Sequence, residues 1–463
     1  MDSRLKGLRT ILMLGTAFIA GVVTGPVTAL IVMYGGIAFG AQTASGELSD
    51  RTSTYRLLAL FGDVFERVPL DYVDPVSDKN LIGNALEGML TGLDPHSGYM
   101  NSEAFRDMQA ETKGEFAGLG MDVTVDNGFL KVISPIDGSP AAKAGIKAGD
   151  LITALDGKTV QGLSLDDLFD HLRGPPYSKI TLTVKRKGVD QPFQLPMRRA
   201  IIHVEVVTQR LEPDKVGYVR LTEFTEKADG ALKQAVKSLR QRAGGRLKAL
   251  VLDLRDNPGG LLDQAVAISS DFVEQGEIVS VRARHPEDGQ RWNSRGRDII
   301  DGIPLVVLTN GGSASSSEIV AAALQDHRRA VLVGARSFGK GSVQTVIPLS
   351  DDGAVRLTTA RYYTPSGRSI QGLGIKPDVP VAETSEEEPQ FGPEREADLN
   401  HVLVNEGGSP NAGEEPRTDL PQIATEIPSK PPKGFPEFDP SKPDDTDFQL
   451  QQALVVVRAM SMK

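Results

Sequence analysis

Short apolar runs alternate with stretches of helical period through residues 201–380. The apolar runs predict strands at 216–221, 247–254, 304–308 and 330–333. The stretches between them predict helices at about 226–242, 262–273 and 315–324. Because parallel strands need long crossover connections, which are usually helices, this order predicts an α/β core. We expect a mixed, largely parallel sheet with flanking helices over 201–380.

The regions on either side of this core have other patterns. Residues 46–113 repeat apolar side chains at helical spacing, which predicts an N-terminal helical segment. Residues 114–200 combine short alternating runs with Gly and Asp turns, which predict a small β-rich domain with one principal helix at 164–172. The range 381–445 is rich in Glu, Pro and Asp and predicts a loose acidic linker, whereas 446–463 predicts a closing helix.

The N-terminus predicts export. Arg4, Lys6 and Arg9 precede a run from Ile11 to Phe39 that contains no charged residue. This pattern makes 1–45 a signal peptide or a membrane anchor, and both place the remaining chain outside the cytoplasm. We therefore expect a protein of the periplasm or cell envelope. The absence of cysteine suits an oxidising compartment, and a net charge of −10 argues against a nucleic-acid partner.

A serine-rich segment joins the predicted strand at 304–308 to the helix that follows it. A serine hydroxyl there lies at a helix N-terminus, where backbone N–H groups and the helix dipole favour a developing oxyanion. The alternative is an ordinary serine N-cap, with Glu318 supporting the first turn. The pattern alone does not choose among the candidates, which are Ser313, Ser315, Ser316 and Ser317.

Lys340 lies between glycines in the segment 337–341. To accept a proton near neutral pH, its pKa must fall from about 10.4 by roughly three units, which burial among apolar groups provides. A solvated lysine in a surface loop is one alternative. A phosphate-binding loop is another, because Gly334 and Gly339 have its spacing. However, Gly341 replaces the Ser or Thr that contacts magnesium, and the residues after it alternate like a strand.

Two turns and two histidines are further candidates. Gly259 and Gly260 follow the predicted strand at 247–254, at an edge where α/β sheets place their sites. Residues 118–121 precede an edge strand and suit a nest for a peptide carboxylate, with an ordinary β-turn as the alternative. His96 and His327 allow a Ser–His pair, or serve as capping and surface residues.

Together these segments resemble the carboxyl-terminal processing peptidases, also called tail-specific proteases, over residues 55–380. Each segment is short, but their combination and order are specific. The segments that carry the resemblance are Leu93-Asp94-Pro95-His96-Ser97, Gly118-Leu119-Gly120-Met121, Ser139-Pro140-Ala141, Gly149-Asp150, Asp253-Leu254-Arg255, Gly259-Gly260, Ser313-Ala314-Ser315 with Ser317-Glu318, Ser337-Phe338-Gly339-Lys340-Gly341 with Gln344, and Tyr362-Tyr363-Thr364-Pro365-Ser366-Gly367.

The resemblance implies roles in the core. Ser315, three residues before the family's Glu, would be the nucleophile. Lys340, 25 residues later, would be the general base, and Gln344 would orient its ammonium. The oxyanion hole would use the N–H of Ser316 and that of the Gly-Gly turn, Gly260 or Gly259. The family usually has Ala where this chain has Ser316.

The resemblance also implies a PDZ fold for 114–200. Its loop, formed by Gly118, Leu119, Gly120 and Met121, would bind the C-terminus of a substrate or gate the cleft. Arg173, at the end of the PDZ helix, would contact the protease core in the active arrangement.

The implied function is that of a serine endopeptidase with a Ser-Lys dyad, which recognises C-terminal tails of exported proteins and needs neither a metal nor another cofactor. The alternative is a non-catalytic PDZ adaptor that binds such tails. The expected partners are protein or peptide substrates and a helical-repeat adaptor, and the expected assembly is a homodimer or a larger oligomer.

Overall fold

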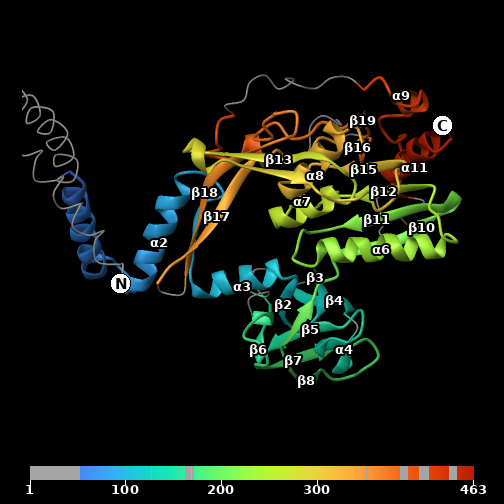
Figure 1. The fold of residues 1–463 in the computed structure, drawn as a ribbon. Helices are drawn as coiled ribbons and strands as arrows, with labels where there is room; N and C mark the ends of the chain where they lie inside the picture. Colours follow the sequence, from blue (N-terminus) through green and yellow to red (C-terminus); the bar gives the residue numbers. More distant parts are fainter. Residues whose placement is uncertain are drawn as a thin grey trace, which may run out of the picture. The chain divides into compact units, whose positions relative to one another are not determined.

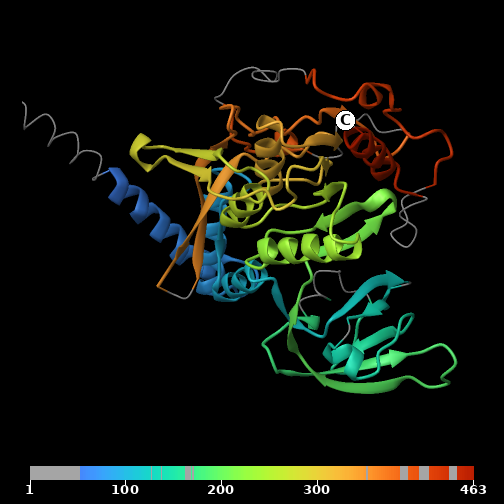
Figure 2. The ribbon, with the colours of Figure 1, turned by 45° about the vertical axis from the view of Figure 1, so that its right-hand side comes forward.

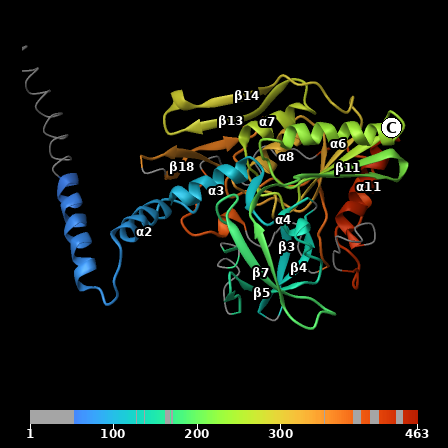
Figure 3. The same ribbon diagram turned by 90° about the horizontal axis from the view of Figure 1, so that it is seen from below.

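The computed structural model describes residues 53–126, 128–136, 138–161, 168, 171–350, 353–385, 395–405, 417–436 and 446–462. The chain forms two compact units, residues 1–84 and 85–463. Figures 1, 2 and 3 show the chain from three directions.

The described part of the first unit is helical. Residues 53–71 form one helix, and α2 (Asp78–Thr91) begins in this unit. The helix at 53–71 exposes several large apolar side chains, namely Tyr55, Leu57, Leu58, Leu60, Phe61, Val64 and Leu70. No helix in the described part of the chain is long and apolar enough to cross a membrane. The predicted signal peptide or anchor at 1–45 lies outside the described residues.

Six strands form the central sheet of the second unit, in the order β10-β11-β12-β15-β16-β19. Their bounds, in that order, are Val207–Glu212, Val216–Leu221, Ala249–Asp253, Leu305–Thr309, Val331–Gly334 and Val379–Pro380. All neighbouring strands are parallel except β10, which pairs antiparallel with β11. The prediction of an α/β core with a mixed, largely parallel sheet is confirmed.

Helices cover both faces of this sheet (Figures 1 and 3). On one face lie α6 (Ala228–Arg242), α7 (Leu262–Ser270) and α8 (Ser316–Asp326), in one apolar cluster with alternate strand residues such as Leu250 and Leu252. On the other face α11 (Phe448–Met460) packs against the residues between them, such as Val251. Successive residues of a strand point to opposite faces, so β12 is buried on both sides, which explains its continuous apolar run.

A second, antiparallel sheet lies beside the core and was not predicted as a sheet. Its order is β1-β18-β13-β14, and β17 pairs with β18. The strands β1, β13, β14, β17 and β18 span Gly98–Met100, Gly276–Ala283, Gln290–Ser294, Ser342–Pro348 and Ala354–Tyr363. The alternation after Lys340 corresponds to β17. Strand β1 interrupts the segment predicted as helical, between α2 and α3 (Ser102–Thr112). Short 3-10 turns occur at Pro213–Lys215 and Pro286–Asp288.

The β-rich fold predicted between 114 and 200 is confirmed. Strands β2 to β9 span Glu115–Gly118, Met121–Asp126, Phe129–Pro135, Leu151–Leu155, Lys158–Thr159, Lys179–Lys185, Phe193–Arg198 and Ala200–His203. The order β3-β4-β5-β7-β8 forms one sheet, β6 pairs with β5, and β2 pairs with β9 where the chain enters and leaves the domain. A short helix, α4 (Pro140–Lys143), covers a core that includes Leu130 and Leu182. The predicted helix at 164–172 lies mostly outside the described residues.

The range 381–445, predicted as a loose acidic linker, contains buried residues in the stretches that the structure describes. Glu396, in the 3-10 turn Glu396–Asp398, is 1% exposed and accepts a hydrogen bond from Nε2 of Gln371. Ala424, in α9 (Ile423–Glu426), joins the apolar cluster beneath α11. Acidic, proline-rich composition describes the average of this range and therefore conceals the few residues that anchor it.

Candidate active site

Ser315 lies where the loop after β15 turns into α8. Its backbone has φ 52° and ψ −111°, a combination that residues other than glycine rarely adopt, and the residue is 8% exposed. The loop before Ser315 is hydrogen-bonded to the residue that follows β12, because Oγ of Ser313 donates to the carbonyl of Leu254 over 2.7 Å. The N–H of Ala314 also donates to the carbonyl of Asn257 over 3.0 Å. This turn places the Ser315 hydroxyl at a helix N-terminus.

Lys340 lies in the loop between β16 and β17. Its Nζ donates to Oε1 of Gln344 over 2.8 Å, and Nε2 of Gln344 in turn donates to Oγ of Ser342 and Oγ1 of Thr358. Burial lowers the pKa of the Lys340 ammonium, and the positive charge of Arg356 lowers it further. The environment therefore makes this amine easier to deprotonate than an ordinary lysine.

Glu318 connects the loops that carry Ser315 and Lys340. Its carboxylate is fully buried. One oxygen accepts from the N–H groups of Ser315 (2.8 Å) and Lys340 (2.9 Å). The other accepts from Oγ of Ser337 (2.6 Å) and the N–H of Gly339 (2.8 Å). Burial raises the pKa of Glu318 to about 7, although its four donors favour the charged form. Sequence reasoning assigned Glu318 only to the first turn of its own helix.

The Ser315 hydroxyl and the Lys340 ammonium are not hydrogen-bonded to each other, since Lys340 donates to Gln344 and no Ser315–Lys340 hydrogen bond occurs within the described ranges. Proton transfer between them requires an approach to about 2.6–3.2 Å. The structure thus brings their loops together through Glu318 without joining the two side chains.

The Gly-Gly turn lies directly beside Ser315. A Cβ on Gly259 would come within 2.9 Å of Cβ of Ser315, and a Cβ on Gly260 would come within 2.5 Å of the carbonyl oxygen of Phe224. Both glycines also have φ values, 109° and 136°, that favour glycine, so the close approach depends on these residues.

The amides of this turn differ in availability. The N–H of Gly259 already donates to Oδ1 of Asn257 over 2.9 Å. The N–H groups of Gly260 and Ser316 have no hydrogen-bond partner among the residues with described positions. Of the two glycines named from the sequence, the geometry therefore favours Gly260 as an oxyanion donor and argues against Gly259.

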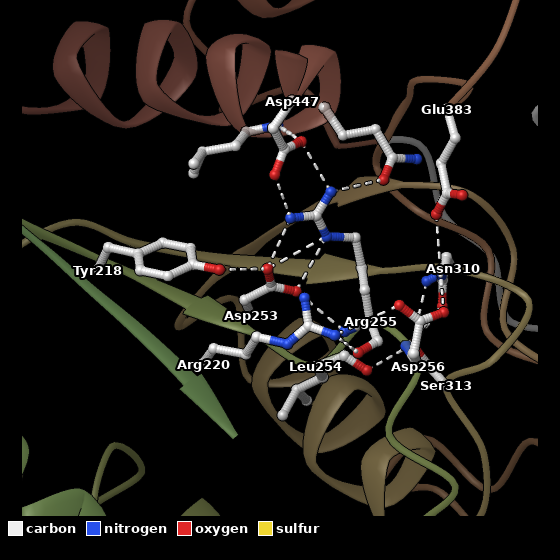
Figure 4. Close-up of polar contacts among 12 residues, drawn as sticks. Tyr218, Arg220, Asp253, Leu254, Arg255, Asp256, Asn310, Ser313, Glu383 and Asp447 are labelled. Atoms are coloured by element: carbon white, nitrogen blue, oxygen red, sulfur yellow. Dashed lines mark hydrogen bonds and ion pairs between the residues drawn. The ribbon is translucent and has the colours of Figure 1, made fainter. Parts of the chain in front are cut away.

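A buried ion-pair network holds the end of β12, and Figure 4 shows its members pointing toward one another. Arg255 donates to both oxygens of Asp253 and to both oxygens of Asp447, the N-cap of α11, with closest contacts of 2.7 Å. Burial raises the pKa of Asp253, but the Arg255 charge outweighs it, and the net pKa lies below the usual value. This network was not predicted, because Asp447 lies 192 residues after Arg255.

Asp94, also without a predicted role, supports the Lys340–Gln344 pair. Its carboxylate accepts from Oγ of Ser97 (2.7 Å) and from Oγ1 of Thr358 (3.0 Å), and Thr358 accepts from Gln344. The only signal for this role in the sequence was the Asp94-Pro95-His96-Ser97 segment of the resemblance.

Neither candidate histidine contacts Ser315. Nε2 of His96 lies 2.8 Å from Oε2 of Glu396, and Nε2 of His327 lies 2.7 Å from the carbonyl oxygen of Glu277. The Ser–His alternative therefore has no support in this geometry. The phosphate-loop alternative is wrong, because a strand, β17, and not a helix follows Lys340.

The candidate PDZ residues lie apart from this site in the sequence and form the β2–β3 loop. Gly118 ends β2, Leu119 is buried in the domain core, and Met121 begins β3. Gly120 has φ 71°, and its carbonyl accepts from Oγ of Ser139 over 2.8 Å. Arg173 is half exposed, and Nη1 lies 3.9 Å from Oε1 of Glu111 in α3. The role of residues 118–121 in substrate binding and that of Arg173 in activation remain predictions.

Comparison with known protein families gives a match for the α/β core and a match for the β-rich domain. Peptidase family S41 matches residues 215–381, and the PDZ domain family matches residues 131–186. A carboxy-terminal-processing protease of Bartonella bacilliformis is 51% identical over 365 residues, which cover 79% of this chain and 81% of the relative. The carboxy-terminal processing protease CtpA of Bacillus subtilis is 33% identical over 317 residues, 68% of this chain and 67% of the relative.

A solved structure, the photosystem II D1 C-terminal processing protease, is 32% identical with a TM-score of 0.42, and the match covers 72% of this chain and 93% of that chain. The match to the Bartonella relative shows the family. The chain therefore belongs to peptidase family S41 with the carboxy-terminal processing proteases, and it is a serine peptidase that carries a PDZ domain.

Proposed function

We propose that the chain cleaves peptide bonds with Ser315 as the nucleophile and Lys340 as the general base. The observation that carries this proposal is the single buried carboxylate of Glu318, which accepts hydrogen bonds from the backbone N–H groups of both residues. A carboxylate shared in this way holds the backbone of Ser315 and that of Lys340 at a fixed separation, which an unrelated serine and lysine would not require. The lowered pKa of Lys340 supports the same assignment, because a general base must be neutral.

The reaction begins when a peptide lies with its scissile carbonyl beside Ser315. Nζ of neutral Lys340 leaves Gln344, takes the Ser315 proton, and Oγ attacks the scissile carbonyl carbon. The N–H groups of Ser316 and Gly260 donate to the oxyanion of the tetrahedral intermediate. Lys340 then transfers its proton to the leaving amine. Water, deprotonated by the same lysine, hydrolyses the acyl-enzyme and restores the Ser315 hydroxyl. Gln344 holds the ammonium between these transfers.

The substrates are proteins or peptides, and we propose that they are recognised by their C-terminal tails. The relatives' names describe carboxy-terminal processing, and the PDZ domain is a module that suits an extended tail. The charge pattern of residues 1–45 supports a location in the periplasm or cell envelope, where exported proteins are the available substrates. A helical-repeat adaptor and assembly into a homodimer or larger oligomer remain predictions.

Two substitutions in the full chain test the catalytic assignment. Ser315→Ala and Lys340→Ala should each reduce the turnover of a fluorogenic peptide by at least about 10³-fold, because they remove the nucleophile and the base. Both variants should retain the thermal midpoint of the wild type within a few degrees. Undiminished cleavage by purified Ser315→Ala would refute the nucleophile, and binding of a tail peptide without any cleavage by the wild type would favour the adaptor alternative.

A further inference from the structure

Ser316 has a side chain that the mechanism above does not use. The residue is fully buried, and its Oγ donates a hydrogen bond to the carbonyl oxygen of Gly260 over 2.9 Å. Ser316 and Gly260 are also the two residues whose N–H groups are available beside Ser315. This contact therefore connects the two proposed oxyanion donors directly, through one residue's side chain and the other's carbonyl.

The other hydrogen bonds of the Gly-Gly turn join it to segments other than Ser316. The carbonyl of Gly259 accepts from the N–H of Phe224, and the carbonyl of Phe224 accepts from the N–H of Leu261, each over 2.8 Å. These bonds align the turn with the chain that leaves β11. On the side of α8, Oγ of Ser317 donates to the carbonyl of Asn257 over 2.8 Å, three residues before Gly260. Within the described ranges, only the Ser316 hydroxyl joins α8 to Gly260 itself by a hydrogen bond.

This contact matters because the bonds to Phe224 hold the two peptide groups of Gly260 to the chain after β11, whereas among the described residues the Ser316 hydroxyl alone joins α8 to Gly260. Its φ of 136° belongs to a region that glycine explores freely. An oxyanion hole accelerates the reaction only if its donors are already oriented, because reorienting them during the reaction costs the energy that they would supply. A hydroxyl that bridges α8 and Gly260 restrains the separation of the two N–H groups.

We propose that Ser316 is a positioning residue, whose hydroxyl holds the N–H of Gly260 at a fixed separation from its own N–H and so preorganises the oxyanion hole. The inference rests on the proposed function of Ser315. An alanine at this position keeps both N–H groups but removes the bond that sets the position of Gly260 relative to α8, so the loss should be confined to the transition state and should not affect peptide binding.

The test compares full-chain Ser316→Ala with Ser294→Ala. Ser294 is the control, because its buried hydroxyl also donates to a backbone carbonyl, that of Val273. Val273 lines the cavity by the C-terminal end of α8, and the Ser294 hydroxyl also accepts from the N–H of Gly296 over 3.1 Å. The measurements are kcat and KM for a fluorogenic peptide, and the inhibition constant of a peptide boronic acid, which forms a tetrahedral adduct with the serine. For Ser316→Ala we expect kcat to fall by about three- to tenfold and the boronate to weaken by a similar factor, the effect of one lost hydrogen bond. KM should stay within about twofold, and Ser294→Ala should lower the thermal midpoint but not kcat.

The proposal is overturned if Ser316→Ala keeps kcat and boronate affinity within about twofold of the wild type, if only KM changes, or if Ser294→Ala loses kcat equally. Should Ser316→Ala not fold, Ser316→Cys provides the same comparison, because its thiol has a similar shape but donates weakly, and its kcat should also fall. Ser315→Ala, measured in parallel, separates the two claims. If it stays active, the proposed function fails; if it is inactive while Ser316→Ala is normal, only the positioning role fails.

Discussion

Two of the buried acidic centres in the described part of the protease core are stabilised in different ways. The first is Glu318, whose carboxylate accepts from three backbone N–H groups and one hydroxyl. The second, the Arg255 centre, consists of Arg255 with Asp253 and Asp447. Both Glu318 and Asp253 have no solvent exposure, yet burial raises the pKa of Glu318 to about 7, while Arg255 keeps that of Asp253 below its usual value.

This difference separates two tasks. The Arg255 guanidinium lowers the pKa of Asp253, so that carboxylate stays charged across the physiological pH range, and the Arg255 centre suits a permanent link between β12 and α11. Neutral donors leave Glu318 close to its titration midpoint, so the link between the Ser315 and Lys340 loops is the one that responds to pH. We infer that structural anchoring and catalytic positioning are assigned to different acids in the same core.

Among changes to the two acidic centres, replacing Glu318 by Gln should have the largest effect. Each carboxylate oxygen accepts two donors, and an amide NH₂ in place of one oxygen would face two donors and leave them unpaired. We expect kcat to fall by at least about 100-fold and the free energy of unfolding to fall by about 2–4 kcal/mol. Peptide cleavage and chemical denaturation measure the two effects. Exposed Glu287→Gln is the control and should change neither; a kcat of Glu318→Gln within threefold of wild type would contradict the role.

The same variant tests the pH contrast. The folded-state pKa of Glu318 lies above its unfolded value, so the folded protein retains the proton longer than the unfolded chain. Stability should therefore decrease as pH rises from about 4.5 to about 7 through this residue, and Glu318→Gln should lack that contribution. Equal slopes of unfolding free energy against pH in the variant and the wild type would show that Glu318 does not titrate in this range.

Asp447→Asn should have a smaller effect on catalysis than on stability. It removes one of the two carboxylates that neutralise Arg255, a residue whose side chain is 8% exposed. Because Asp253 remains, we expect a loss of about 3 kcal/mol in unfolding free energy and a fall in kcat well below that of Glu318→Gln. Asp419→Asn is the control, since Asp419 pairs with Arg417 but is 44% exposed, and it should cost less than about 1 kcal/mol. A larger loss of kcat in Asp447→Asn than in Glu318→Gln would contradict the assignment of catalytic positioning to Glu318 and of structural anchoring to the Arg255 centre.

The fold was predictable where strands are buried on both faces. The strand β11 has the bounds expected from the sequence, and β12 differs by two residues at its start and one at its end. The strands β13 and β18 were missed because buried apolar residues are mixed there with arginines such as Arg282 and Arg361, which obscure the period. Their pairing is also between segments far apart in the sequence.

The candidate site was predictable only as a set of segments. The sequence, with the family resemblance, named Ser315, Lys340 and Gln344, and the structure places the last two in contact. It could not indicate that Glu318 accepts from the Lys340 N–H, 22 residues later. Nor could it indicate that Gly259 donates to Asn257, because that bond depends on the path of a turn that no local pattern specifies.

The smallest expected effect concerns the charges around Lys340. Burial is the largest cause that lowers the pKa of Lys340, and the positive charge of Arg356 is the next, whereas the negative charge of Glu396 raises it. Arg356→Gln should raise the pKa of Lys340. Because Lys340 must be neutral to act as the base, the acidic limb of kcat/KM should move to higher pH, by less than about one unit since solvent screens the exposed guanidinium.

Arg356→Lys is the control, because it keeps the charge and should leave the pH profile in place. It separates the effect of the charge from that of the hydrogen bond that Arg356 donates to the carbonyl of His96. Since neither Glu318 nor the Arg255 centre is altered, stability should not change. An acidic limb that stays in place in Arg356→Gln would mean that the limb does not report an ammonium close to Arg356, which would contradict its assignment to Lys340.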